Sequence, residues 1–254
     1  MAAAFIASHG EQFADPVEPP VAFGSCWRRV TAPDLDGWWC PGTGAPIVFS
    51  HGYGGDREGL RKLSNTLHER TGRGVLLPRL AYASGAQPFG GGEREGATIA
   101  AALRWAATET STAPVVFGFS VGGYAALRAV ASGAPTAAVI VDSSFLSSRD
   151  VFMFGATKVV PSPQWLWAGM PFVFPVASQG GHLGEVDAGA VASWSVPTLA
   201  IRCRADDTVP LPYQRELVDR LHAQEWVGSC DEHTGAYDAD PAAYVDRVVA
   251  FLST

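Results

Sequence analysis

A serine flanked by glycines is the first candidate for chemistry in this sequence. Residues 118–122 read Gly-Phe-Ser-Val-Gly, a G-x-S-x-G pentapeptide with Ser120 at its centre. The apolar run before it predicts a buried strand, and the small and apolar residues after it predict a helix. On such a turn the strained serine is lifted clear of the sheet, and the first helical amides face a developing oxyanion. The alternative is a chance match in a glycine-rich chain, so other residues must agree.

A serine hydroxyl needs a base to take its proton, and the base needs an acid to fix its tautomer. Of the six histidines, His233 alone is predicted to lie between the last strand and the last helix. Its alternative role is that of a solvated loop residue. The other five lie in the N-terminal segment, the first glycine loop, two predicted helices and the central segment: His9, His51, His68, His222 and His182.

The acid is expected after the next-to-last predicted strand, where Asp206 and Asp207 are neighbours. Successive residues of an extended turn point in different directions, so only one of them is expected to reach His233. The other then forms the turn or caps a helix. Asp142, at the end of an earlier strand, is a third candidate, with a turn aspartate as its alternative role.

The elements that would position these residues alternate between strands and helices. Predicted strands span 25–31, 35–40, 47–50, 75–77, 115–119, 137–141, 198–202 and 225–228. Helical patterns fill most of the intervals, including 93–108, 212–222 and 241–252. This order predicts an α/β fold with a mostly parallel central sheet, helices on both of its faces and an antiparallel edge formed by the first two strands.

The predicted organisation is a core with one insertion. Residues 1–22 are expected to be a loose lead-in, 23–144 and 195–254 the core, and 145–194 a small apolar lid over the carboxyl edge of the sheet, where open α/β folds bind ligands. The lid aromatics and methionine could line a pocket for an apolar or aromatic acyl group, or they could pack the lid onto the sheet or onto a second subunit. They are Trp165, Trp167, Met170, Phe172 and Phe174.

Composition narrows the possible partners. A formal net charge of −7 argues against nucleic acid. The cysteines show no metal-binding spacing and are expected to be buried reduced thiols rather than disulfides: Cys26, Cys40, Cys203 and Cys230. The N-terminus lacks a basic region and a long apolar run, so we expect no membrane span and a cytoplasmic protein. Neither a metal nor a cofactor is predicted, and the oligomeric state is left open.

Four motifs together resemble the α/β-hydrolase superfamily, in its serine-hydrolase branch. They are HGYGG at 51–55, GFSVGG at 118–123, DDTVP at 206–210 and the late loop histidine, and the resemblance covers about residues 45–144 and 195–254. It implies that Asp206, the first residue of a D-x-x-V-P pattern, is the acid. It also implies that the backbone N–H groups of Tyr53 and Val121 are the oxyanion donors. The chain departs from many relatives at 77–84, where LPRLAYAS replaces a D-x-R-G-x-G-x-S loop.

The resemblance implies acyl transfer without a cofactor. Ser120 would attack a carbonyl, His233 would take the proton and Asp206 would stabilise the imidazolium, with a carboxylic ester or thioester of an apolar or aromatic acid as the small-molecule substrate. A serine rather than an aspartate at the turn speaks against relatives that open epoxides or displace halide. Two alternatives remain: a peptidase or amidase with the same triad, and a non-hydrolytic tailoring or binding protein that reuses the fold.

Overall fold

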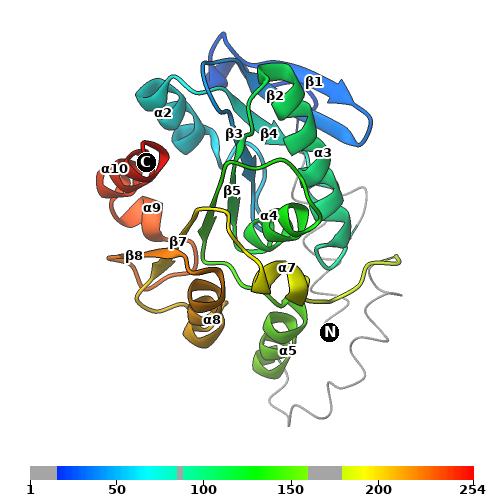
Figure 1. Ribbon diagram of the computed structural model, residues 1–254, viewed down its shortest axis with the longest axis vertical. Helices are drawn as coiled ribbons and strands as arrows, with labels where there is room; N and C mark the ends of the chain where they lie inside the picture. The colour runs from blue at the N-terminus through cyan, green and yellow to red at the C-terminus, as the bar shows by residue number, and fades with distance from the viewer. Residues whose placement is uncertain (1–15, 85–87, 160–178) are drawn as a thin grey trace.

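The computed structural model describes residues 16–84, 88–159 and 179–254 (Figure 1). Its centre is one eight-stranded sheet with the strand order β1-β2-β4-β3-β5-β6-β7-β8. The strands are β1 (Arg28–Ala32), β2 (Leu35–Cys40), β3 (Ile47–Ser50), β4 (Val75–Pro78), β5 (Val115–Phe119), β6 (Ala138–Asp142), β7 (Thr198–Cys203) and β8 (Gln224–Gly228).

The sheet is parallel except at one edge. β1 pairs antiparallel with β2, and β2 pairs antiparallel with β4. The pairs from β4 through β3, β5, β6 and β7 to β8 are all parallel. The predicted mostly parallel sheet with an antiparallel edge is therefore confirmed. Because the six strands β3 to β8 pair in parallel, their carboxyl ends meet at one edge of the sheet.

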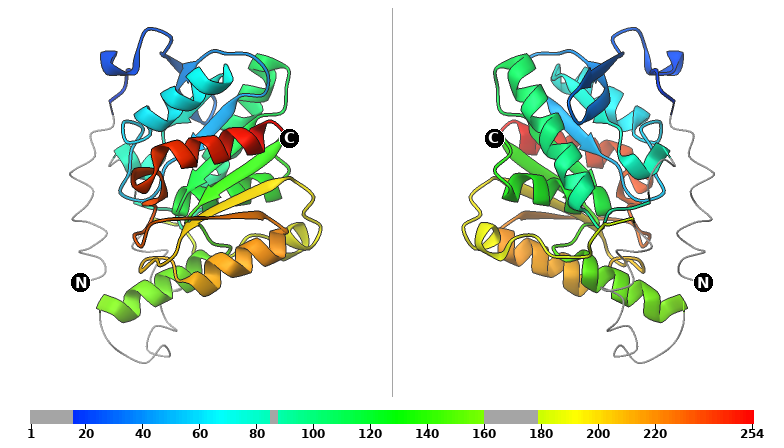
Figure 2. Two further views of the ribbon diagram at one scale, coloured as in Figure 1. Left: turned by 90° about the vertical axis from the view of Figure 1, so that its left-hand side faces the viewer. Right: turned by 90° about the vertical axis from the view of Figure 1, so that its right-hand side faces the viewer.

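Helices cover both faces of this sheet. One face packs against α2 (Arg61–Thr71), α9 (Ala236–Ala239) and α10 (Pro241–Leu252), and the other against α3 (Glu93–Thr110), α4 (Val121–Ala131) and α8 (Leu211–Leu221). Figure 2 shows α10 in front in its left view and α3 in front in its right view. No helix in the described part of the chain is both long and apolar enough to cross a bilayer.

Successive side chains of the strands pack alternately into two separate hydrophobic cores, one on each face of the sheet. In β3, Ile47 and Phe49 join the core under α2 and α10, while Val48 joins the core under α3 and α4. All three are at most 1% exposed. A strand buried on both faces has no polar side to present, which explains the uninterrupted apolar runs of the central strands.

The segment after β6 begins with a helix that the sequence did not predict, α5 (Ser148–Val159). Near its start the Ser148 hydroxyl donates to the Gly91 carbonyl at 3.0 Å. In its middle the ring of Phe152 stacks on Phe89, with centroids 5.4 Å apart. Near its end Lys158 hydrogen-bonds the carbonyl of Asp207. The helix thus runs from the loop before α3 to the loop after β7, and α5 and α8 lie at the same end of the molecule in Figure 2.

The five lid residues expected to line a pocket lie outside the described residues: Trp165, Trp167, Met170, Phe172 and Phe174. Of the rest of that segment, the structure describes α5 and a second, five-residue helix, α7 (Ala188–Ala192). The expected pocket at those five positions therefore stays a prediction.

The prediction that the cysteines are reduced is wrong. Cys26 is bonded to Cys40, and Cys203 to Cys230, with Cα atoms 5.0 and 4.9 Å apart. The partners are distant in sequence and become neighbours only through strand pairing, which spacing alone does not reveal. Disulfides persist mainly in oxidising compartments. The cytoplasmic location stays a prediction, and the two bridges weigh against it.

Candidate active site

Ser120 lies on the strained turn between β5 and α4. Its backbone angles, φ 50° and ψ −121°, belong to a region that residues with a side chain rarely occupy. Its own amide donates to the Asp142 carbonyl at 2.8 Å, which ties the turn to the end of β6. The turn therefore presents Ser120 at the carboxyl edge of the sheet, directly before the first residue of α4.

Glycines make this turn possible. A Cβ on Gly118 would lie 2.5 Å from the Cα of Gly123, and one on Gly122 would lie 2.3 Å from the Ser50 carbonyl oxygen. A Cβ on Gly123 would lie 2.6 Å from the Ser144 hydroxyl. Each of these distances is shorter than atoms tolerate, so the spacing of glycines around Ser120 follows from close contact between backbones.

The imidazole of His233 bridges Ser120 and Asp206. Its Nε2 lies 2.9 Å from the Ser120 hydroxyl oxygen, and its Nδ1 lies 2.8 Å from Asp206 Oδ2. The His233 side chain is 20% exposed, whereas that of Asp206 is fully buried. Three residues from the ends of β5, β7 and β8 thus form one continuous chain of contacts.

The Asp206 carboxylate is held on both oxygens. Oδ1 accepts the amides of Thr208 at 2.8 Å and Val209 at 2.9 Å. Oδ2 accepts the side-chain amide of Gln214, on α8, at 3.0 Å in addition to facing His233. These bonds satisfy the buried carboxylate and fix its orientation.

The two other candidate acids lie elsewhere. The Asp207 side chain is 88% exposed, with one oxygen 4.0 Å from Lys158 Nζ. Asp142 is buried at the end of β6, where its carboxylate accepts the Tyr244 hydroxyl at 2.8 Å and the Ser143 hydroxyl at 2.9 Å. Burial raises the pKa of Asp142 to about 6. Of the three, Asp206 is the one whose carboxylate hydrogen-bonds the imidazole of His233.

Asp142 is nevertheless connected to the histidine loop. The Ser143 hydroxyl that donates to Asp142 also accepts the backbone amide of Thr234 at 3.2 Å. Ser143 and Thr234 both have positive φ, 52° and 57°. The loop that carries His233 is therefore docked onto the end of β6 through this pair of contacts.

The glycine loop that follows β3 packs directly on the serine turn. A Cβ on Gly52 would lie 3.3 Å from the Phe119 carbonyl oxygen and 3.5 Å from the Ser120 Cβ. Tyr53 follows Gly52, and Val121 follows Ser120, so both expected oxyanion donors belong to segments that meet at this contact. Their role as donors stays a prediction.

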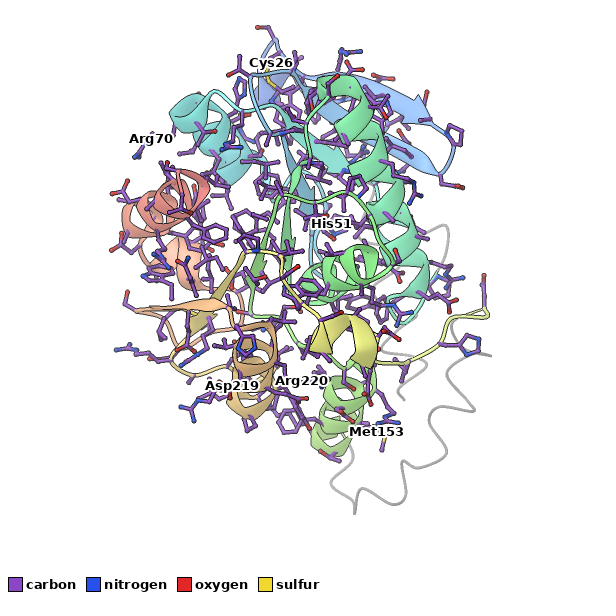
Figure 3. The ribbon with its side chains drawn as sticks, in the orientation of Figure 1. Cys26, His51, Arg70, Met153, Asp219 and Arg220 are labelled. Atoms are coloured by element: carbon purple, nitrogen blue, oxygen red, sulfur yellow. A yellow bond between two sulfur atoms is a disulfide. The ribbon has the colours of Figure 1, made fainter. Side chains whose placement is uncertain are left out.

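His51 shapes this loop from inside. Its Nδ1 lies 3.0 Å from the Gly52 carbonyl oxygen, and burial lowers its pKa to about 4, so the ring is neutral at pH 7. Its backbone carbonyl accepts the buried Tyr82 hydroxyl at 2.9 Å. Figure 3 shows His51 near the centre of the molecule.

Aromatic rings adjoin the same loop. The Phe89 ring centroid lies 5.9 Å from that of Tyr53, 6.0 Å from that of Tyr82 and 5.4 Å from that of Phe152. We refer to Tyr53, Tyr82, Phe89 and Phe152 as the aromatic cluster. It connects the glycine loop to α5.

One group of residues with metal-binding chemistry occurs in the described part of the chain. Cys26, Cys40 and His68 lie together, with their ligand atoms within 4.8 Å of one another. The two sulfurs are bonded to each other, and metals bind thiolates rather than disulfide sulfurs. Cys40 pairs with Val75, the first residue of β4, so this cluster lies at the opposite edge of the sheet from Ser120.

Sequence reasoning missed three contributors to the site. Gln214 lies on a helix face, where nothing in the sequence marks it as a partner of Asp206. Ser143 was not considered, although it follows a candidate acid at a strand end. The Cys203–Cys230 bridge had a visible signal, because each cysteine precedes a candidate catalytic residue by three positions.

Solved structures share this architecture. The esterase Pf2001 of Pyrococcus furiosus has a TM-score of 0.73 at 23% identity, over 92% of this chain and 93% of that chain. The Exiguobacterium antarcticum esterase EaEST has a TM-score of 0.61 at 16% identity, over 89% and 99%. MGS-MChE2, an alpha/beta hydrolase enzyme from a Moroccan lagoon-sediment metagenome, has a TM-score of 0.59 at 17% identity, over 89% and 98%. The chain has the α/β-hydrolase fold.

This α/β-hydrolase fold was predicted from the sequence and is confirmed. At identities below 25%, the likeness extends to the fold alone. No protein-family model matches the sequence, and no curated protein is significantly similar to it. Within this fold, Ser120 lies on the turn between β5 and α4.

Proposed function

We propose that this protein is a serine hydrolase that cleaves carboxylic esters or thioesters through an acyl-enzyme intermediate. The observation that carries the proposal is the chain of contacts from Ser120 through His233 to Asp206, with both imidazole nitrogens within 2.9 Å of their partners. A nucleophile, a base and an orienting acid in this order form the minimal machinery for acyl transfer.

The proposed reaction has two halves. With Nδ1–H donating to Asp206, the free electron pair of His233 Nε2 faces the Ser120 hydroxyl and accepts its proton as the oxygen attacks the carbonyl carbon. The imidazolium returns that proton to the leaving alcohol or thiol, which leaves the acyl group on Ser120. His233 then takes a proton from water, the hydroxide attacks the acyl carbon, and the proton returns to Ser120.

The tetrahedral intermediates need donors for their oxyanion. We assign this role to the backbone N–H groups of Tyr53 and Val121. The support is the contact between the glycine loop and the serine turn, together with the position of Val121 as the first residue of α4. Amides at the start of a helix are free to donate and lie at the positive end of its dipole.

The substrate preference follows from the surroundings of Ser120. The aromatic cluster adjoins the glycine loop, and the rings of Tyr53 and Phe152 remain partly exposed. Apolar or aromatic acyl groups gain from burial against such rings, whereas a charged acyl group would lose hydration there. We therefore propose an apolar or aromatic acyl group, and a small molecule rather than a macromolecule as the substrate.

Labelling with a fluorophosphonate tests the proposal, because these reagents modify an activated serine. We expect the unaltered chain to be labelled once, on Ser120, and the Ser120→Ala variant to remain folded and unlabelled. The matched control is Ser50→Ala, which removes a buried hydroxyl at the end of the neighbouring strand β3. Labelling that survives in Ser120→Ala, or that fails in the unaltered folded chain, would contradict the proposal.

A substrate panel separates esters from amides. We expect turnover of p-nitrophenyl esters and acyl thioesters that increases from acetyl to longer or aromatic acyl groups, and slow or absent turnover of aminoacyl anilides. Faster cleavage of the anilides would make the protein a peptidase or amidase. A folded protein with an unreactive Ser120 that binds an apolar ligand tightly would make it a binding protein.

A further inference from the structure

The loops that carry Asp206 and His233 each leave the sheet at a cysteine. Cys203 is the last residue of β7 and stands three residues before Asp206. Cys230 lies just after β8 and stands three residues before His233. The two cysteines are bonded to each other, with Cα atoms 4.9 Å apart. One covalent bond therefore joins the bases of both loops.

A hydrogen bond and close packing accompany this bridge. The backbone amide of Arg204 donates to the carbonyl of Cys230 at 2.8 Å, one step beyond the last pairing of the two strands. A Cβ on Gly228 would lie 3.3 Å from Cys230 Sγ, so the bridge packs tightly against the end of β8. Cys203 is fully buried and Cys230 is 7% exposed. The bases of the two loops are thus fixed relative to each other at a buried bridge.

The histidine lies on a short segment that is anchored at both ends. Cys230 anchors it three residues before His233, and the Thr234 amide, which donates to Ser143 at 3.2 Å, anchors it one residue after. The acid loop has its own supports, since Asp206 accepts two amides of its turn and the Gln214 side chain. The bridge therefore acts mainly on where His233 lies relative to an already fixed Asp206.

We propose that the Cys203–Cys230 disulfide is a positioning element for the reaction, which keeps His233 within hydrogen-bond distance of both Asp206 and Ser120. This inference rests on the function proposed above. The physical reason is that proton transfer between Ser120 and His233 needs heavy atoms about 2.6–3.2 Å apart. A displacement of about 1 Å costs on the order of 100-fold in rate.

The chain contains a matched control. The Cys26–Cys40 disulfide is also a covalent cross-link with a fully buried member, Cys40. It lies at the amino edge of the sheet, because Cys40 pairs with Val75, the first residue of β4. Figure 3 shows Cys26 at the top of the molecule, well away from His51. Removing the Cys26–Cys40 bridge therefore removes one covalent cross-link and leaves the loops of Asp206 and His233 unchanged.

Kinetics of the two double variants form the first measurement. We expect Cys203→Ala/Cys230→Ala to lose about 10- to 100-fold in kcat with little change in KM. The reason is that the aromatic cluster proposed to bind the substrate keeps its place, while the imidazole of His233 moves. We expect Cys26→Ala/Cys40→Ala to keep kcat within about twofold. Both are assayed well below their own melting temperatures, so that a folded protein is compared in each case.

The second measurement does not depend on turnover. An imidazole Nδ1 proton that is hydrogen-bonded to a buried carboxylate gives a proton NMR signal far downfield, and its loss in His233→Ala assigns it. We expect this signal in the unaltered chain and in Cys26→Ala/Cys40→Ala. We expect it to be lost or broadened by exchange in Cys203→Ala/Cys230→Ala.

The third measurement covers the case in which the Cys203→Ala/Cys230→Ala variant does not fold. In the Cys26→Ala/Cys40→Ala background only one bridge remains. One dithiothreitol molecule gives up two electrons and two protons, closes to its cyclic disulfide and leaves Cys203 and Cys230 as thiols. Alkylation and mass spectrometry give the fraction reduced, and we expect kcat to fall in proportion to it and to recover on reoxidation.

The outcomes separate this inference from the proposed function. Unchanged kcat and an unchanged downfield signal after loss of the Cys203–Cys230 bond would overturn the positioning role, as would equal losses in both double variants. If the unaltered chain fails to react with a fluorophosphonate, and the signal still disappears only with the Cys203–Cys230 bond, the proposed hydrolase function fails and the positioning role stands.

Discussion

Asp206 contacts His233 through one carboxylate oxygen and its own turn through the other. Oδ2 lies 2.8 Å from His233 Nδ1, while Oδ1 accepts the amides of Thr208 and Val209. This division of roles fixes the carboxylate through Oδ1, while Oδ2 faces the imidazole and also accepts the Gln214 side-chain amide. It also distinguishes Asp206 from the adjacent Asp207, whose side chain is 88% exposed.

The first prediction compares these two neighbours. Asp206→Asn is expected to lower kcat by about 10⁴-fold, because an amide N–H in place of the carboxylate favours the wrong imidazole tautomer. Asp207→Asn is expected to leave kcat within about twofold, since its side chain is in solvent. Steady-state kinetics on a p-nitrophenyl ester measures both. Equal effects of the two substitutions would remove Asp206 from the proposed triad.

The second prediction concerns Gln214, which donates to Asp206 Oδ2 at 3.0 Å and to the Val209 carbonyl at 2.6 Å. Gln214→Leu keeps the volume and removes both bonds, so the carboxylate gains freedom to turn away from His233. We expect kcat to fall about tenfold with KM unchanged. The melting temperature, measured by calorimetry, reports whether the fold is affected. A large drop in melting temperature with normal kcat would make Gln214 a structural residue only.

Local patterns predicted much of the fold. The apolar runs of β3, β5 and β7 and the helical spacing of α2, α3 and α10 each depend on neighbouring residues, and the structure places their ends within a few residues of the predicted bounds. α5 was missed because the segment after β6 mixes phenylalanine, methionine and glycine without a clear period. Instead, side chains of α5 contact Phe89 and Asp207, which are distant from the helix in sequence.

The site was harder to predict than the fold, because it depends on side-chain directions at strand ends. The residue pattern alone did not decide which of Asp206, Asp207 and Asp142 is the acid that contacts His233, since all three lie at the ends of strands that finish at the same edge of the sheet. In the folded chain, Asp142 is directed to the Tyr244 hydroxyl. The disulfides were mispredicted for a similar reason: the pairing of Cys203 with Cys230 follows from the adjacency of β7 and β8.

The third prediction concerns the packing of the serine turn. In Gly123→Ala the new Cβ would lie 2.6 Å from the Ser144 hydroxyl and 3.1 Å from the Gly118 carbonyl oxygen, so the turn must shift. We expect a loss of about 1–3 kcal/mol in the free energy of unfolding, and loss of fluorophosphonate labelling. Gly59→Ala is the control, because its Cβ meets Asp56 atoms at an ordinary 3.7 Å. Denaturant melts and labelling rates measure both, and equal behaviour of the two variants would contradict the close packing.

The fourth prediction follows from the buried carboxyl of Asp142, whose pKa burial raises from 3.8 to about 6. The Tyr244 and Ser143 hydroxyls and the nearby imidazole of His233 lower this pKa, and Asp206 raises it, but burial has the largest effect. Below about pH 4, Asp142 is protonated in both the folded and the unfolded chain. Between about pH 4 and pH 6 the unfolded chain loses this proton while the folded chain keeps it, so rising pH lowers the stability of the fold.

Above about pH 6, the buried Asp142 carboxylate therefore lowers the free energy of unfolding by on the order of 3 kcal/mol, which corresponds to the rise of about two in its pKa. Asp142→Asn removes it, so the free energy of unfolding of the variant should rise relative to that of the unaltered chain between pH 4 and pH 6, and the difference should be constant above that range. Urea denaturation at several pH values measures this difference. For Asp207→Asn, at an exposed position, the free energy of unfolding should change with pH in parallel with that of the unaltered chain. Parallel curves for Asp142→Asn as well would mean that its carboxyl ionises normally in the folded protein.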